Sequence, residues 1–155
     1  MPIPNNEHEQ KLTISVDVFI PNHPDRSDTP IFRATHKKLI GSNPNARCEV
    51  NNQHCDKIHP LELHHSVIEW CDSLGVDWER VKKLVPSFDW SNFDPLKPET
   101  FIDSEWNANQ VLCKKHHTGL DHGKHFLPEP LWNMQGVQLS NFIFSPDEEN
   151  NASTS

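Results

Sequence analysis

The sequence lacks a long apolar run and has few hydrophobic residues. No segment approaches the roughly 18 consecutive apolar residues that a membrane-spanning helix requires, so we expect no membrane association. Hydrophobic residues make up 34% of the 155 residues. A chain of this composition builds only a modest core, so we expect a bound metal or an oligomer contact to supplement it. Its length fits one domain and leaves little room for a second.

Positive charge is also scarce. The chain has 14 Lys and Arg against 22 Asp and Glu, which gives a net charge of −8. Nucleic-acid-binding domains are usually basic, so this balance weighs against tight, autonomous DNA binding. Part of the excess is peripheral, because no Lys or Arg follows Lys124. The first residues, MPIPNNEHEQ, lack the charged and then apolar pattern of a secretion signal, which predicts a cytoplasmic protein.

Cysteine and histidine are the residue types that stand out. Four Cys and 11 His in a reducing compartment indicate metal binding rather than disulfides. Cys113 and His116 form a tight C-x2-H pair, and Cys48 and Cys55 form a looser C-x6-C pair. Zinc prefers four such ligands in a tetrahedron, commonly as two close pairs. We therefore predict a structural Cys3His zinc site that contributes folding free energy directly.

The first pair leaves alternatives open. A spacing of six residues is wide for a zinc pair, and His54 or His59 could replace one of its members. The competing interpretation is that these are buried free cysteines, a common state of Cys in cytosolic proteins. Cys71 lies on the apolar face of a predicted helix, so we assign it to the core.

Two pairs of adjacent histidines, His64-His65 and His116-His117, suggest a second metal site. Phosphodiester hydrolysis needs a nucleophilic water, a base that deprotonates it, and a cation near the phosphate. Neighbouring side chains on a strand point to opposite sides. One histidine of the first pair can therefore bind metal while the other reaches the water. In the second pair, we expect His116 to face the zinc and His117 the second metal.

The motifs LELHH, NQVLCKKHH and HGKH together resemble the HNH endonuclease family, in its double-His variant with a Cys/His zinc site. Its ββα-metal core consists of two strands and a helix around one divalent ion. Weaker similarity in TPIFRATHKKLIG, HHSVIEW, SFDWSNFD and PEPLW resembles HNH proteins common in bacterial and phage genomes. The resemblance covers residues 22–135. Residues 1–21 would then be an N-terminal segment, and residues 136–155 a C-terminal segment with a disordered tail.

The resemblance implies an α+β fold: a small ββα-metal core, stapled by the structural zinc, with flanking helices and long loops. It also implies roles for individual residues. His64 matches the first metal ligand of the family and His65 the general base. His117 matches the ligand in the third motif, and His125 best fits the further ligand expected after it. The implied cofactors are a structural Zn²⁺ and a catalytic divalent ion such as Mg²⁺ or Mn²⁺.

Two positions of the family pattern stay open in this chain. His122 and Asp121 are nearer alternatives to the last metal ligand. The middle Asn of the family usually lies five residues before the Cys, and this chain has Ala108 there, between Asn107 and Asn109. On a strand both neighbours point away from the side that Ala108 faces, so a bulge or a one-residue shift is needed. We choose Asn109 as the candidate catalytic Asn.

The sequence therefore predicts a metal-dependent HNH endonuclease that hydrolyses phosphodiester bonds in DNA. Lys114, Lys115 and Lys124 flank the predicted site, as phosphate contacts should. The alternative is a catalytically inactive, zinc-stapled HNH-fold module that acts through a protein partner. The net charge of −8 and the Ala at position 108 favour this alternative, whereas the two intact histidine pairs favour the enzyme.

Overall fold

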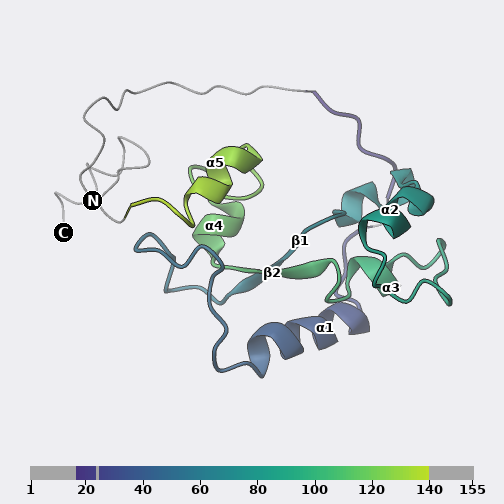
Figure 1. The fold of residues 1–155 in the computed structure, drawn as a ribbon, viewed down its shortest axis with the longest axis horizontal. Coiled ribbons are helices and arrows are strands. Elements are labelled where there is room, and N and C mark those ends of the chain that lie inside the picture. Colours follow the sequence, from purple (N-terminus) through teal and green to yellow (C-terminus); the bar gives the residue numbers. More distant parts are fainter. Residues whose placement is uncertain (1–16, 24, 140–155) are drawn as a thin grey trace.

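The computed structural model describes residues 17–23 and 25–139, and its centre is a two-stranded antiparallel sheet (Figure 1). The strands are β1 (Glu62–His65) and β2 (Ala108–Leu112). The expectation of a small fold that mixes helices and strands is confirmed. The helical elements in chain order are α1 (Pro30–His36), the π-helical η1 (Lys37–Gly41), the 3₁₀ turn η2 (Trp70–Gly75), α2 (Trp78–Leu84), α3 (Glu99–Ile102), α4 (Lys114–Thr118) and α5 (Glu129–Met134).

The sheet contains an irregularity at the position where the sequence required one. Leu63 pairs with Val111 and His64 with Gln110, but His65 pairs with Ala108. The residue between the last two partners, Asn109, is therefore left without an opposite residue, as at a β-bulge. The predicted bulge is confirmed. The extra residue lies on β2, opposite the step from His64 to His65 on β1.

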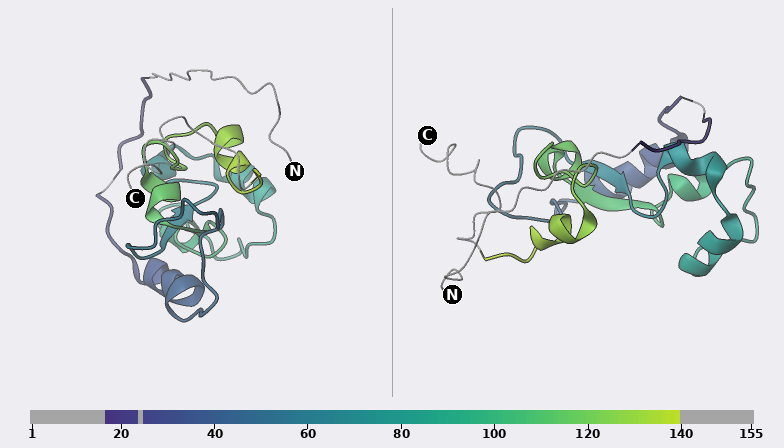
Figure 2. Two further views of the ribbon diagram at one scale, coloured as in Figure 1. Left: turned by 90° about the vertical axis from the view of Figure 1, so that its left-hand side faces the viewer. Right: turned by 90° about the horizontal axis from the view of Figure 1, so that it is seen from above.

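Helices lie at both ends of the sheet and along one side of it. Figure 1 shows α4 and α5 at one end, η2, α2 and α3 at the other, and α1 beside β2. The view from above in Figure 2 shows the same separation of α5 from α2. Each described helix has seven residues or fewer, so the stability of these helices depends on side-chain contacts more than on helix propensity. Thr29, for example, caps α1 by accepting a hydrogen bond from Phe32 N at 3.0 Å.

Two separate hydrophobic clusters follow from this arrangement. One, at the end of the sheet that carries α4 and α5, contains Cys48, Val50, Leu112, Cys113 and Trp132. The other, at the opposite end, has Ile68, Val81, Phe101 and Ile102 at its centre, with half-buried aromatic side chains packed around them. Cys71 is only partly buried and belongs to neither cluster of the described residues, so its assignment to the core is wrong.

The predicted flanking segments are described only in part. Residues 1–16 and 140–155, which make up most of the expected N- and C-terminal segments, lie outside the described residues, as does residue 24. Among the residues that the structure does describe, no helix has both the length and the apolar character needed to cross a membrane.

Candidate metal centres

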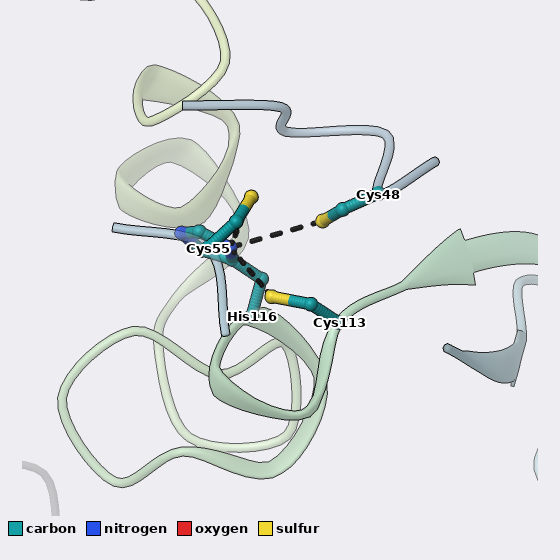
Figure 3. A group of neighbouring side chains, drawn as sticks. All are labelled: Cys48, Cys55, Cys113 and His116. Atoms are coloured by element: carbon teal, nitrogen blue, oxygen red, sulfur yellow. Dashed lines mark hydrogen bonds between the residues drawn. The ribbon is translucent and has the colours of Figure 1, made fainter. Parts of the chain in front are cut away.

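Four side chains from two separate segments converge at one end of the sheet (Figure 3). Cys113 follows β2 directly and is the N-cap of α4, and His116 lies one turn later in that helix. Cys48 and Cys55 come from the loop before β1, which is tied to β2 by a hydrogen bond of 2.8 Å from Glu49 N to Val111 O. Their ligand atoms all lie within 4.8 Å of one another. The predicted grouping is confirmed.

The distances within this group fit a tetrahedral ion. The Nδ1 atom of His116 lies 3.2 Å from Cys113 Sγ, 3.6 Å from Cys55 Sγ and 3.8 Å from Cys48 Sγ. A tetrahedral zinc, about 2.3 Å from sulfur and about 2.1 Å from nitrogen, separates the two atoms by about 3.6 Å. The Cys3His cluster could therefore hold a structural metal such as zinc.

The wide spacing of Cys48 and Cys55 is closed by a compact turn. Asn51 adopts φ 46°, a left-handed conformation that Asn tolerates better than most residues. The side chain of Asn52 accepts a hydrogen bond from His54 N at 2.9 Å, and its carbonyl accepts one from Cys55 N at 3.2 Å. This turn brings Cys55 close to Cys48.

Charge makes this cluster suited to a cation. Burial raises the pKa of the Cys55 thiol to about 12; a backbone hydrogen bond at Asn52 opposes this rise, and the neighbouring Cys48 and Cys113 add to it. Three thiolates cannot share such a space unless a cation offsets their repulsion. A divalent ion provides that compensation and stabilises the deprotonated form that binds it.

The alternative ligands for this site lie elsewhere. His59 is exposed, and its Nδ1 lies 2.7 Å from Asp56 Oδ2. The ring of His54 lies 5.8 Å from that of His122, which in turn lies 6.0 Å from His116. Neither His54 nor His59 belongs to the group of four ligand atoms.

A second group consists of three histidines. His64 on β1, His117 on α4 and His125 after the following turn place their ligand atoms within 4.8 Å of one another. The Nε2 atoms of His117 and His125 are 3.1 Å apart. Two imidazole ligands of one ion, each about 2.1 Å from it, are separated by about 3.0 Å in octahedral and about 3.4 Å in tetrahedral geometry. The three histidines that the sequence singled out are therefore brought together.

A tight turn brings His125 back to His117. Lys124 N donates to His116 O at 2.9 Å and His125 N to His117 O at 3.3 Å. Gly123 is required in this turn, because a Cβ atom there would lie 2.9 Å from His117 O and closer still to Gly119 O. The nearer alternatives, Asp121 and His122, stay outside the three-histidine group.

Glu62 orients His117. Its Oε2 lies 2.6 Å from His117 Nδ1. Because a carboxylate only accepts hydrogen bonds, Nδ1 carries the proton and Nε2 keeps the lone pair that a metal needs. Sequence reasoning did not single out Glu62. The available signal was its position two residues before His64, on the same face of the strand.

His64 is held in the neutral form. Its pKa is lowered to about 3, first by burial and then by the charges of His125, His117, Lys124 and His65. Its Nδ1 is buried, makes no hydrogen bond to a described residue, and lies 3.5 Å from Glu69 Oε1. A neutral, buried imidazole with a free nitrogen is suited to bind a metal ion.

His65 lies beside this group but does not belong to it. Its Nε2 lies 3.1 Å from Asp103 Oδ1, and its ring stacks on Phe32 with the centroids 5.9 Å apart. Its Nδ1 lies 3.8 Å from Glu69 Oε2. Glu69 therefore lies between His65 and the three-histidine group, since its other oxygen is 3.9 Å from His125 Nδ1.

Asn107, not Asn109, connects the strand ends behind the histidines. Its Oδ1 accepts hydrogen bonds from Val67 N and Ile68 N, both at 2.9 Å, and its Nδ2 donates to Ile68 O at 2.9 Å and Ile102 O at 2.8 Å. Asn109 is exposed at the bulge, where its Nδ2 lies 3.5 Å from Trp106 O. The structure thus assigns the positioning of the backbone after His65 to Asn107.

No protein-family model, curated protein or solved structure matches the chain. The two candidate metal centres share α4. His116 belongs to the Cys3His cluster, and its neighbour His117 belongs to the three-histidine group. A metal in the first centre would fix the helix that presents a ligand to the second.

Proposed function

We propose that this chain is a metal-dependent endonuclease of the HNH type that hydrolyses phosphodiester bonds in DNA. One observation carries the proposal: the two histidine pairs converge, so that His64, His117 and His125 surround one point and His65 stands beside them with a separate set of partners. Three ligands and an adjacent base are the parts that metal-assisted hydrolysis requires.

In this proposal His64, His117 and His125 would hold a divalent ion. Bound there, the ion supplies positive charge that stabilises the phosphorane-like transition state and the leaving oxygen. Imidazole nitrogens suit Zn²⁺, Ni²⁺ and related ions better than Mg²⁺, which prefers oxygen ligands. We therefore expect activity with transition ions, Mn²⁺ included, to exceed activity with Mg²⁺.

His65 would accept the proton of the attacking water. The Cys3His cluster would hold α4 against the loop before β1, and Asn107 would hold the backbone that follows His65. Lys114 and Lys115 lie on α4 next to His117, where they would contact the phosphates on either side of the scissile bond. These two lysines partly offset the overall negative charge where the substrate would lie.

The experiment is plasmid cleavage by the full-length, zinc-loaded protein. Supercoiled plasmid is incubated with Mg²⁺, Mn²⁺, Ni²⁺, Zn²⁺ or EDTA, and the wild-type protein is compared with His65→Ala. We expect metal-dependent nicking that falls at least about 100-fold in the variant, because a positioned base contributes about that much. The matched control is His59→Ala, which removes an exposed histidine paired with Asp56.

A second candidate is the inactive zinc-stapled module that acts through a protein partner. It is favoured by the net charge of −8 and by the side chain of His65, which is only 10% exposed. The plasmid assay separates the two candidates. A folded, zinc-replete protein that leaves DNA intact with every ion supports the module and contradicts the enzyme.

A further inference from the structure

Asp103 is a buried carboxylate that neither the histidine pattern nor the family resemblance singled out. It follows α3 directly and has no exposed side-chain surface. It lies where α1, α3 and the end of β1 meet, and its backbone carbonyl accepts a hydrogen bond from Thr35 Oγ1 at 2.8 Å. A fully buried carboxylate is costly unless donors surround it.

Three donors satisfy this carboxylate. Arg26 Nη1 lies 2.9 Å from Oδ1, Thr29 Oγ1 lies 2.7 Å from Oδ2, and His65 Nε2 lies 3.1 Å from Oδ1. Burial alone would raise the pKa of Asp103, but the hydrogen bonds from His65, Thr29 and Arg26 outweigh burial and lower the pKa. The side chain is therefore an ionised acceptor.

An ionised acceptor determines which ring nitrogen of His65 carries the proton. A carboxylate cannot donate, so Nε2 of His65 must carry the hydrogen, and in the neutral ring Nδ1 is left with the lone pair. Phe32 stacks on the ring at an interplanar angle of 28°, which restrains its rotation. The free Nδ1 then faces Glu69, on the side of the three-histidine group.

Arg26 links this arrangement to the segment before α1. Its guanidinium forms the ion pair with Asp103 and lies 4.8 Å from the centroid of the Phe32 ring and 5.2 Å from that of Trp70. Cation–π contacts of this kind hold the charged group in place. Arg26 therefore contacts both Asp103 and the Phe32 ring that stacks on His65.

We propose that Asp103 is a positioning residue that holds a ring proton of His65 on Nε2 and so leaves Nδ1 to face the attacking water. The proposal rests on the proposed nuclease function only for the final step, the use of that nitrogen. The placement of the proton is a property of the folded protein and can be measured without DNA.

The first measurement is the histidine ring N–H spectrum of ¹⁵N-labelled, full-length, zinc-loaded protein, with His65 assigned by comparison with His65→Gln. We expect a slowly exchanging, downfield ring proton on Nε2 of His65, because this proton is bonded to a buried carboxylate. A wild-type protein whose His65 carries the protected proton on Nδ1 overturns the proposal, and this result needs no variant.

The second measurement uses Asp103→Asn, which keeps the shape of the side chain and removes its charge. We expect the Nε2 proton to move upfield and exchange faster, kcat to fall about 100-fold, and KM and zinc content to stay unchanged. An unchanged His65 resonance or an unchanged kcat in a folded variant overturns the proposal. Asp77→Asn is the control, because Asn caps α2 as well as Asp does and the change removes the same charge at an exposed helix N-cap that bonds Glu79 N and Arg80 N.

The two proposals fail differently. If wild-type protein does not cut DNA but the Nε2 proton is present and shifts in Asp103→Asn, the nuclease function is wrong and the positioning role of Asp103 stands. If the protein cuts DNA and Asp103→Asn changes neither the spectrum nor kcat, the nuclease function stands and the inference about Asp103 is wrong.

Discussion

The two ends of the sheet are stabilised by different means. The cysteine end, which we define by Cys48, Val50, Leu112, Cys113 and Trp132, contains the Cys3His cluster. The aromatic end, defined by Phe101, Ile102 and the rings packed on them, has none of the described metal-binding groups. Its rings lie close together: Phe101 is 4.9 Å from Trp90 and 5.2 Å from Phe88.

This difference explains how a chain with so few hydrophobic residues folds around two strands. Apolar burial stabilises a region in proportion to the area removed from water, and among the described residues the aromatic end has more apolar side chains packed on its core. The cysteine end makes up its deficit with metal-binding groups, since binding free energy at such a site is also folding free energy. The three-histidine group takes His64 from β1 and His117 from α4 at the cysteine end, so it shares a helix with the Cys3His cluster.

The largest expected effect comes from breaking the cysteine end. Cys113→Ser removes a buried ligand next to β2, so we expect loss of bound zinc. The free energy of unfolding should fall by several kcal/mol, about half or less of the binding free energy of a structural zinc site. Zinc content by elemental analysis and thermal unfolding with and without EDTA measure this. Cys71→Ser, outside the cluster, should keep both zinc and stability. A Cys113→Ser protein with full zinc content would contradict the assignment.

A smaller loss is expected at the aromatic end. Phe101→Ala empties a fully buried position, and such changes cost about 3–5 kcal/mol. Urea unfolding at saturating zinc measures the loss, and zinc stoichiometry should stay unchanged because the ligands lie at the other end. If Phe101→Ala releases zinc as readily as Cys113→Ser does, the two ends are not separate and the comparison fails.

Asn107→Ala tests the connection between the ends. The change leaves the backbone N–H groups of Val67 and Ile68 without their acceptor, so we expect a loss of about 2–3 kcal/mol. The matched variant Asn109→Ala, at the exposed bulge, should change stability by less than about 0.5 kcal/mol. Equal effects of the two changes in urea unfolding would contradict the positioning role of Asn107.

The smallest effect on stability is expected at Glu62. Glu62→Gln weakens the hydrogen bond that orients His117, and loss of such a partner lowers metal affinity about 10- to 100-fold. Titration of zinc-loaded protein with Ni²⁺ or Co²⁺, followed by calorimetry, measures affinity at the three-histidine group. The exposed Glu79→Gln on α2 serves as the control. Unchanged affinity in Glu62→Gln would show that the carboxylate does not orient a ligand.

Local spacing was enough to predict the Cys3His cluster and the two histidine pairs, whereas His125 was chosen from the family resemblance. Cys113 and His116 are three residues apart, which places them on one helical turn, and His64 and His65 are neighbours on a strand. The need for a bulge also followed from strand alternation, because the Asn residues flank Ala108 instead of occupying its position. Strand alternation could not decide between Asn107 and Asn109, because the position of Asn107 depends on its hydrogen bonds to Ile68 O and Ile102 O.

By itself the sequence determined which side chains can bind metal and which of them are neighbours, because residue type and short-range spacing decide both. The tertiary structure decided what surrounds them. Asp103 reaches His65 across 38 positions and Arg26 across 77, and Glu62 reaches His117 across 55. Hydrogen bonds over such separations join elements that are distant in the chain, so no local sequence pattern predicts them.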